Sequence, residues 1–86
     1  MEPTENYDFG RALAKLKRGA RVQRDGWNGK GMWLGLCAGL RINLACDRGE
    51  DRDTLPFIVM KTVTGHYVPW LASQTDVLAS DWRDVP

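Results

Sequence analysis

Histidine and cysteine are scarce in this chain of 86 residues, which holds one histidine and two cysteines. Cys37 and Cys46 lack the spacing of a zinc site, and His66 cannot complete a metal cluster by itself. Neither cysteine has a histidine at a partner position visible in the sequence, so small buried thiols are favoured over reactive ones. We therefore expect no enzymatic activity, no metal and no cofactor.

Excess charge and long apolar runs are also absent. Twelve basic residues against eleven acidic ones leave a net charge of +1, which argues against a protein that coats DNA through bulk electrostatics. The longest apolar stretch, near 32–40, is far shorter than the ~18 residues of a membrane span, and residues 1–8 do not resemble a signal peptide. We expect a cytoplasmic protein with reduced thiols and with neither DNA nor membrane as partner.

The length predicts a single domain, 1–86, in which residues 1–6 form a frayed leader. A monomer of this size buries only about 60% of the surface that its unfolded chain exposes. Assembly into a homo-oligomer buries more, and we expect it.

Two helices are predicted. After Asp8, apolar residues recur at helical spacing and predict a helix that Asp8 caps and Gly19 ends. Its inward face carries Phe9, Ala12, Leu13 and Leu16. A short second helix is expected after Ser73, which matches a capping box loosely with Asp76.

Alternating residues predict two β-hairpins and a short terminal strand. The hairpin strands are 20–24 with 32–38 and 57–63 with 66–71, the turn dipeptides are Asn28-Gly29 and Thr64-Gly65, and the terminal strand is 81–85. Pro69 cannot donate to a ladder, which puts its strand at an edge or an end of the sheet. In the terminal strand, Trp82 and Val85 are the expected anchors.

The remaining segment, 39–56, has no clear periodicity, and its mixed-charge part, 47–53, is predicted to be a solvated loop without chemistry. The fold class is therefore α+β. We expect a small antiparallel sheet of two hairpins, with an N-terminal helix and a short second helix, in a chain that assembles as a homo-oligomer.

Two stretches are candidates for a binding site. The first is glycine-rich and holds Arg24, Trp27, Asn28 and Lys30, which supply a stacking face, an amide and positive charge for a nucleotide-sized ligand. The second combines a tryptophan with a helix start, whose N–H groups favour anions, and comprises Trp70, Leu71, Ala72, Ser73, Gln74 and Asp76. Purely structural roles explain the same residues equally well. In the first stretch the tryptophans would cap a small core above a tight turn, and in the second the helix start would be a plain N-cap beneath a core tryptophan.

The strings Gly26-Trp27-Asn28-Gly29-Lys30-Gly31-Met32, Met60-Lys61, 68–76 and Asp81-Trp82 resemble the Thoeris anti-defence 2 family of small phage and prophage proteins. The likeness runs from about residue 9 to residue 85, and only 39–56 fits no family pattern.

The resemblance implies a sponge, not an enzyme. Members of the family sequester cyclic ADP-ribose isomers such as glycocyclic ADP-ribose, and some hold cyclic oligonucleotide signals of CBASS defence, so that the immune effector is not triggered. The resemblance also implies a homotetramer with pockets at protomer interfaces, walled by Trp27, Asn28 and 70–76. We expect Arg24, Lys30 and the N–H groups after Ser73 to hold the diphosphate of such a ligand.

Other functions fit the same residues. A small adaptor would use the aromatic surface to bind a protein or single-stranded nucleic acid, and a hydrolase would degrade the signal. The near-zero net charge disfavours nucleic acid, and the scarcity of titratable groups disfavours the hydrolase.

Overall fold

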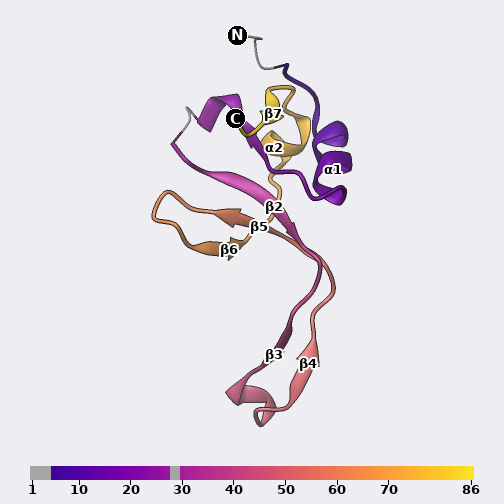
Figure 1. Cartoon of the computed structure of the whole chain (residues 1–86), viewed down its shortest axis with the longest axis vertical. Helices are drawn as coiled ribbons and strands as arrows, with labels where there is room; N and C mark the ends of the chain where they lie inside the picture. The colour runs from indigo at the N-terminus through magenta and orange to yellow at the C-terminus, as the bar shows by residue number, and fades with distance from the viewer. Residues whose placement is uncertain (1–4, 28–29) are drawn as a thin grey trace.

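A computed structural model describes residues 5–27 and 30–86 of the chain. Its centre is a five-stranded antiparallel sheet, drawn in Figure 1. From edge to edge the strands are β6 (Tyr67–Pro69), β5 (Phe57–Lys61), β2 (Trp33–Cys37), β1 (Val22–Arg24) and β7 (Trp82–Asp84). Two α-helices, α1 (Phe9–Lys17) and α2 (Gln74–Leu78), accompany it. The predicted α+β class, with an N-terminal helix, a short second helix and a small antiparallel sheet, is confirmed.

Helix α1 begins and ends where the sequence predicts. The Asp8 carboxylate accepts a hydrogen bond from the backbone N–H of Arg11 at 2.9 Å, which satisfies a donor of the first turn. Gly19 follows the helix with φ of +90°, a conformation that glycine adopts without strain. Ala12 and Leu16 are fully buried against the sheet. The helix therefore supplies core, as expected.

The core lies between α1 and one face of the sheet, and Trp82 is its largest fully buried side chain. Val22 and Leu34, which are register partners on β1 and β2, lie beneath the helix. Trp82 reaches this core from the C-terminal strand, which confirms its predicted role as an anchor. Tyr7 pairs with Trp82 through two backbone hydrogen bonds, so the chain is already held in place before α1 begins.

The predicted pairings of the strands are confirmed, with shorter strands. Strands β5 and β6 form the second hairpin, and β6 lies at the edge of the sheet, where Pro69 is tolerated. Strands β1 and β2 pair at Val22 and Leu34, and a short 3₁₀ turn, η1 (Asp25–Trp27), follows β1. The predicted turn pair Asn28-Gly29 and residues 1–4 of the predicted leader lie outside the described residues.

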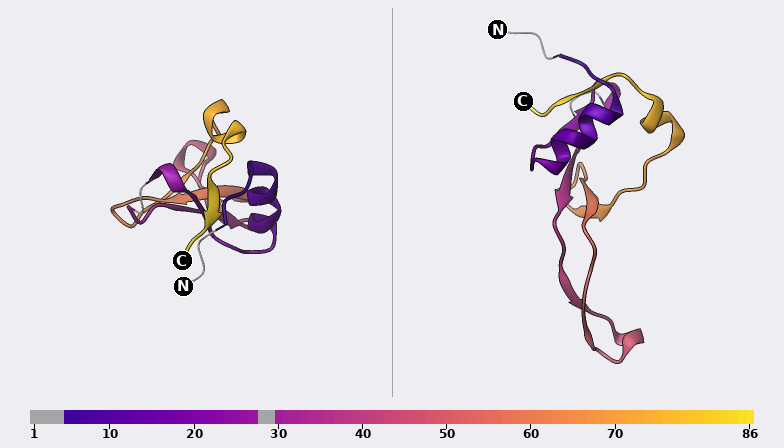
Figure 2. Two further views of the ribbon diagram at one scale, coloured as in Figure 1. Left: turned by 90° about the horizontal axis from the view of Figure 1, so that it is seen from above. Right: turned by 90° about the vertical axis from the view of Figure 1, so that its right-hand side faces the viewer.

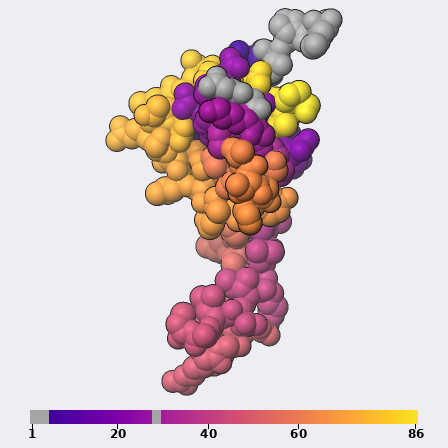
Figure 3. Space-filling view, turned by 90° about the vertical axis from the view of Figure 1, so that its left-hand side faces the viewer, coloured from indigo at the N-terminus to yellow at the C-terminus, as the bar shows by residue number. Residues whose placement is uncertain are grey.

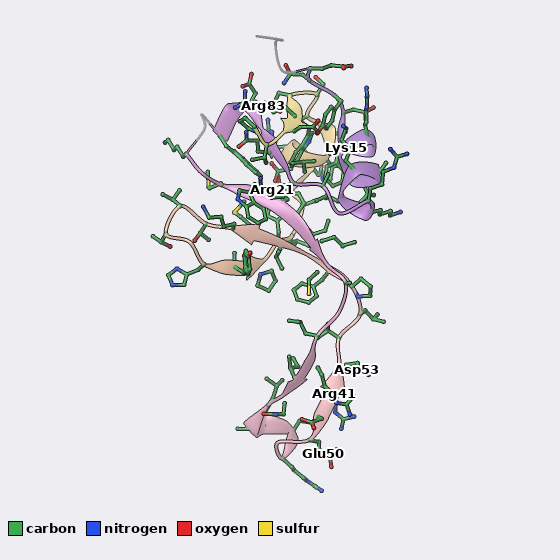
Figure 4. The ribbon with its side chains drawn as sticks, viewed as in Figure 1. Lys15, Arg21, Arg41, Glu50, Asp53 and Arg83 are labelled. Atoms are coloured by element: carbon green, nitrogen blue, oxygen red, sulfur yellow. The ribbon has the colours of Figure 1, made fainter. Side chains whose placement is uncertain are left out.

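The prediction of a loop over 47–53 was wrong in part, because the segment 39–56 is built around two paired strands. This segment contains a second, two-stranded sheet of β3 (Arg41–Asn43) and β4 (Asp51–Asp53), joined through the 3₁₀ turn η2 (Ala45–Asp47). We call residues 39–56 the ribbon. Arg41 of β3 forms an ion pair across the strands with Asp53 of β4 at 3.0 Å, and Figure 4 shows the two side by side. Within 47–53, Arg52 of β4 pairs with Asp47 and Glu50 at the turn. The charges of the ribbon therefore pair both across the strands and around the turn.

The ribbon projects from one end of the molecule, as Figures 1 and 3 show. The principal dimensions of the chain, 51 × 26 × 25 Å, follow from this projection. Cys46 is exposed near the tip, which corrects the prediction that both cysteines are buried; Cys37 is half-buried. Exposure of Cys46 is expected here, because the ribbon has no core of its own in which a thiol could be buried.

Candidate functional site

The two candidate stretches meet at Trp82. The ring of Trp27 packs edge-on against Trp82 with centroids 5.6 Å apart, and the ring of Trp70 does the same at 6.0 Å. Phe9 of α1 lies 5.3 Å from Trp82 and completes the cluster. Trp27 and Trp70 are half-buried, whereas Trp82 is fully buried. Both outer tryptophans are thus held by the core on one side and keep part of their surface at the solvent.

Arg24 connects the same two stretches. Its Nε donates to Asp81 at 2.8 Å and its Nη1 donates to Asp76 at 3.0 Å. The hydrogen bond to the Asp81 carboxylate is the main cause that raises the pKa of Arg24, and the same bond holds the pKa of Asp81 below its usual range. The candidate cation of the first stretch is therefore already paired with two carboxylates.

The start of α2 is a complete capping box. The Ser73 hydroxyl accepts a hydrogen bond from the Asp76 backbone N–H at 3.1 Å, and the Asp76 carboxylate accepts one from the Ser73 N–H at 3.4 Å. This confirms the predicted motif with Asp in the acidic position. The side chain of Asp76 thus brings a negative charge to the helix start, where the sequence suggested a place for the ligand's phosphates.

The other predicted residues surround this cluster. Lys30 is exposed, and its backbone N–H donates to the Trp27 carbonyl at 3.3 Å. Leu71 is 92% exposed beside the helix start, Gln74 is exposed and Ala72 is half-buried. Asn28 lies outside the described residues. Leu71 therefore adds exposed apolar surface next to Trp70.

The terminal strand fastens the first stretch from the other side. Arg83 of β7 pairs with Asp25 of η1 at 3.4 Å, and the indole N–H of Trp82 donates to the Asp76 carbonyl at 2.9 Å. Figure 4 shows Arg83 beside η1 at the compact end of the molecule. Strand β7 thus contacts both η1 and α2, and this role was not visible from the sequence.

A further groove lies elsewhere on the molecule and was not predicted. On the sheet face opposite α1, it has a volume of about 550 Å³ and is lined by none of the predicted site residues that the structure describes. Its lining includes Arg21, Trp33, Gly35, Phe57 and Tyr67. The ring of Trp33 lies over Gly35, with Arg21 stacked on it at 5.1 Å and Tyr67 edge-on at 6.0 Å. Strand alternation places Trp33, Gly35 and Cys37 on one face of the sheet, and this pattern is the feature of the sequence that indicates the groove.

No group of three or more histidine, cysteine, aspartate or glutamate side chains is placed to hold a metal ion within 5–27 and 30–86. Among the same residues, no helix is long and apolar enough to cross a membrane.

Comparison with known proteins assigns the family. The pattern of the family described as a Thoeris anti-defense 2-like domain matches residues 7–85. A curated relative, Thoeris anti-defense 2 of Bacillus phage SP01, is 43% identical over 79 residues, a span of 86% of this chain and 89% of the relative. The match includes both candidate stretches and the ribbon, and this chain belongs to the Thoeris anti-defense 2-like family.

Proposed function

We propose that this chain is a phage or prophage anti-defence sponge, which binds and sequesters a cyclic nucleotide immune signal without cleaving it. The proposed ligands are cyclic ADP-ribose isomers, such as glycocyclic ADP-ribose, or cyclic oligonucleotides of CBASS defence. Sequestration in the cytoplasm of the infected bacterium would keep the signal from its effector. The family assignment supports the anti-defence role.

One structural observation carries the choice of site: two stretches more than forty residues apart in sequence converge on Trp82. Trp27 and Trp70 are half-buried, and the exposed part of each ring is suited to stack on a nucleobase. Base–aromatic stacking is worth about 1–3 kcal/mol per base. Leu71 extends the apolar wall, and the amides of Asn28 and Gln74 would supply hydrogen bonds to base edges. Ala72, Ser73 and Asp76 shape the backbone of the wall.

Positive charge for the diphosphate would come from Lys30. Its side chain is exposed, and within the described residues it takes part in no ion pair. A charge-assisted contact of this kind contributes about 1.5–3 kcal/mol, and the diphosphate could not enter an apolar pocket without such partners.

The proposal includes a homotetramer in which protomer interfaces complete the pockets. The ribbon supports self-association, because Leu40, Ile42 and Leu44 are 50%, 38% and 53% exposed. Alternation puts these three on one face of the ribbon, whereas Arg41 and Asn43 pair with β4 residues on the other. An isolated two-stranded ribbon is only marginally stable, and Leu40 also lines the groove of the sheet. Arg52, the register partner of Ile42, shares this face, and a second copy would cover the apolar side chains around it.

A titration of the ligand into three proteins tests the site. Wild type should bind glycocyclic ADP-ribose or a cyclic dinucleotide, Trp27→Ala should lose at least about tenfold in affinity, and Tyr67→Ala should bind like wild type. Tyr67 is the matched control, since it is an exposed aromatic on the open sheet face. The reverse ranking would move the site to the groove, and no binding by wild type would refute the sponge.

A further inference from the structure

Arg24 lies between the two candidate stretches, and two of its guanidinium nitrogens donate hydrogen bonds to different aspartates. Its Nε donates to Oδ1 of Asp81 and its Nη1 donates to Oδ1 of Asp76. The side chains of Arg24 and Asp76 are only 19% and 17% exposed, and that of Asp81 is 34% exposed. An ion pair with two partners at this degree of burial has a fixed geometry, unlike a pair between fully exposed side chains.

Each carboxylate uses its second oxygen to hold one stretch. Oδ2 of Asp81 accepts the backbone N–H of Gly26 at 3.0 Å, immediately before Trp27. Oδ2 of Asp76 accepts the Ser73 hydroxyl at 2.9 Å and the Ser73 N–H at 3.4 Å, at the start of α2. A connected series of hydrogen bonds therefore runs from η1 through Asp81, Arg24 and Asp76 to the start of α2.

The absence of a side chain at residue 26 permits this approach. A Cβ atom built on Gly26 would lie 3.2 Å from Oδ2 of Asp81, closer than ordinary contact distance. The Asp25 N–H also donates to the Asp81 carbonyl at 2.8 Å, which holds the same turn by a second bond. The turn that carries Trp27 is thus bound to residue 81 by both backbone and side chain.

Local charge disfavours a phosphate at Arg24. One guanidinium faces two carboxylates, so the group carries a net negative charge. Hydrogen bonding to Arg24 and to the Gly26 N–H lowers the pKa of Asp81, which therefore stays ionised at neutral pH. A diphosphate placed on the guanidinium would lie beside both aspartates and repel them.

We propose that Arg24 is a positioning residue, which fixes the Trp27 turn against the start of α2 through Asp81 and Asp76 and does not contact the phosphates of the ligand. The assignment deepens the proposed function and rests on it for the ligand readout. It differs from the expectation drawn from the sequence, in which Arg24 holds the diphosphate.

Asp81→Asn separates the two roles. If Arg24 positions the turn, Arg24→Gln and Asp81→Asn each weaken ligand binding by about tenfold, and the double variant binds no more weakly than either single one. If Arg24 contacts the diphosphate, Asp81→Asn releases the guanidinium and leaves binding unchanged or tighter. Arg18→Gln, which removes an exposed arginine after α1, is the matched control and should bind like wild type.

The salt dependence of affinity gives a second readout that a general loss of stability would not mimic. A cation that contacts phosphate contributes to the slope of log affinity against log salt. Arg24→Gln should therefore keep the wild-type slope, whereas Lys30→Gln should reduce it. A reduced slope in Arg24→Gln would overturn the proposal.

Hydrogen exchange on the ligand-free protein tests the same coupling without any nucleotide. Arg24→Gln should speed exchange of the backbone amides of both Gly26 and Asp76. Neither amide contacts Arg24 itself, since the first donates to Asp81 and the second to Ser73. Amides of β5, across the sheet, should keep wild-type rates and so control for global unfolding. Acceleration at only one of the two amides, or at neither, would refute the coupling. If wild type binds no nucleotide, the sponge fails while exchange still decides the role of Arg24.

Discussion

The compact end of the molecule and the ribbon are stabilised in different ways. At the compact end, Leu16, Val22, Leu34 and Trp82 are fully buried, and charged groups such as Arg24 connect neighbouring elements. In the ribbon every residue of β3 and β4 is exposed, and cross-strand pairs hold the strands together. Figure 2 shows the ribbon extending away from α1 and the sheet. The compact end is stabilised by its own core, whereas in this single chain the apolar side chains of the ribbon stay exposed.

Truncation of a core side chain should give the largest effect. Leu16→Ala truncates a fully buried side chain between α1 and the sheet and should lower the free energy of unfolding by about 2–5 kcal/mol. The same truncation at Leu44, which is 53% exposed, should cost about 0.5 kcal/mol or less in dilute protein. Urea unfolding followed by tryptophan fluorescence measures both. Equal losses would mean that the ribbon has a core of its own.

Charges placed on the ribbon's apolar face should change assembly and leave the fold intact. Ile42→Arg combined with Leu44→Arg should reduce the mass of the wild-type assembly measured by light scattering, with an unchanged circular dichroism spectrum. Asn43→Arg, on the opposite face of β3, is the control and should keep the wild-type mass. A wild type that is monomeric at micromolar concentration would contradict the proposed tetramer.

Acid should weaken the compact end through Asp81 and Asp84. The hydrogen bond from Arg24 lowers the pKa of Asp81, and the hydrogen bond from Tyr7 lowers the pKa of Asp84. A carboxyl group with a lowered pKa stabilises the fold above its unfolded value of 3.8, and this stabilisation is lost as pH falls through the lower folded value. Asp81→Asn should therefore flatten the decline in stability below about pH 4. Thermal melts of both proteins between neutral and acidic pH measure the difference, and identical slopes would remove Asp81 from the account.

Removal of a surface pair in the ribbon should have the smallest effect. Arg41 and Asp53 are 64% and 73% exposed, so Arg41→Gln should lower stability by less than about 1 kcal/mol. Leu16→Ala, measured in parallel, sets the scale of the comparison. A cost as large as that of Leu16→Ala would show that the pair is buried by a partner copy.

Local signals in the sequence predicted much of the fold. Helical spacing located α1, a proline identified β6 as an edge strand, and Ser73 with Asp76 marked the start of α2. Trp82 was recognisable as an anchor because it is a large apolar residue in a short terminal strand. Each of these features depends on residues a few positions apart, for which spacing and propensity are informative.

Contacts between distant residues were not predictable in the same way. Arg24 lies 52 residues from Asp76 and 57 from Asp81. They converge because α2 ends at Leu78 and the chain then turns back into β7. In the ribbon, the mixed charges of 47–53 are typical of a solvated loop, and the pairing of β4 with β3 becomes visible only when the register of the two strands is known.

The most direct test of the proposed function follows the ligand itself. Wild-type protein is incubated with a cyclic ADP-ribose isomer or a cyclic dinucleotide, separated from unbound ligand by filtration, and denatured by heat before chromatography of the supernatant. The sponge predicts that the protein fraction retains the nucleotide and releases it intact, and that the released material activates the immune effector. A cleaved product would indicate a hydrolase, and an empty protein fraction would favour the adaptor; either result would contradict sequestration.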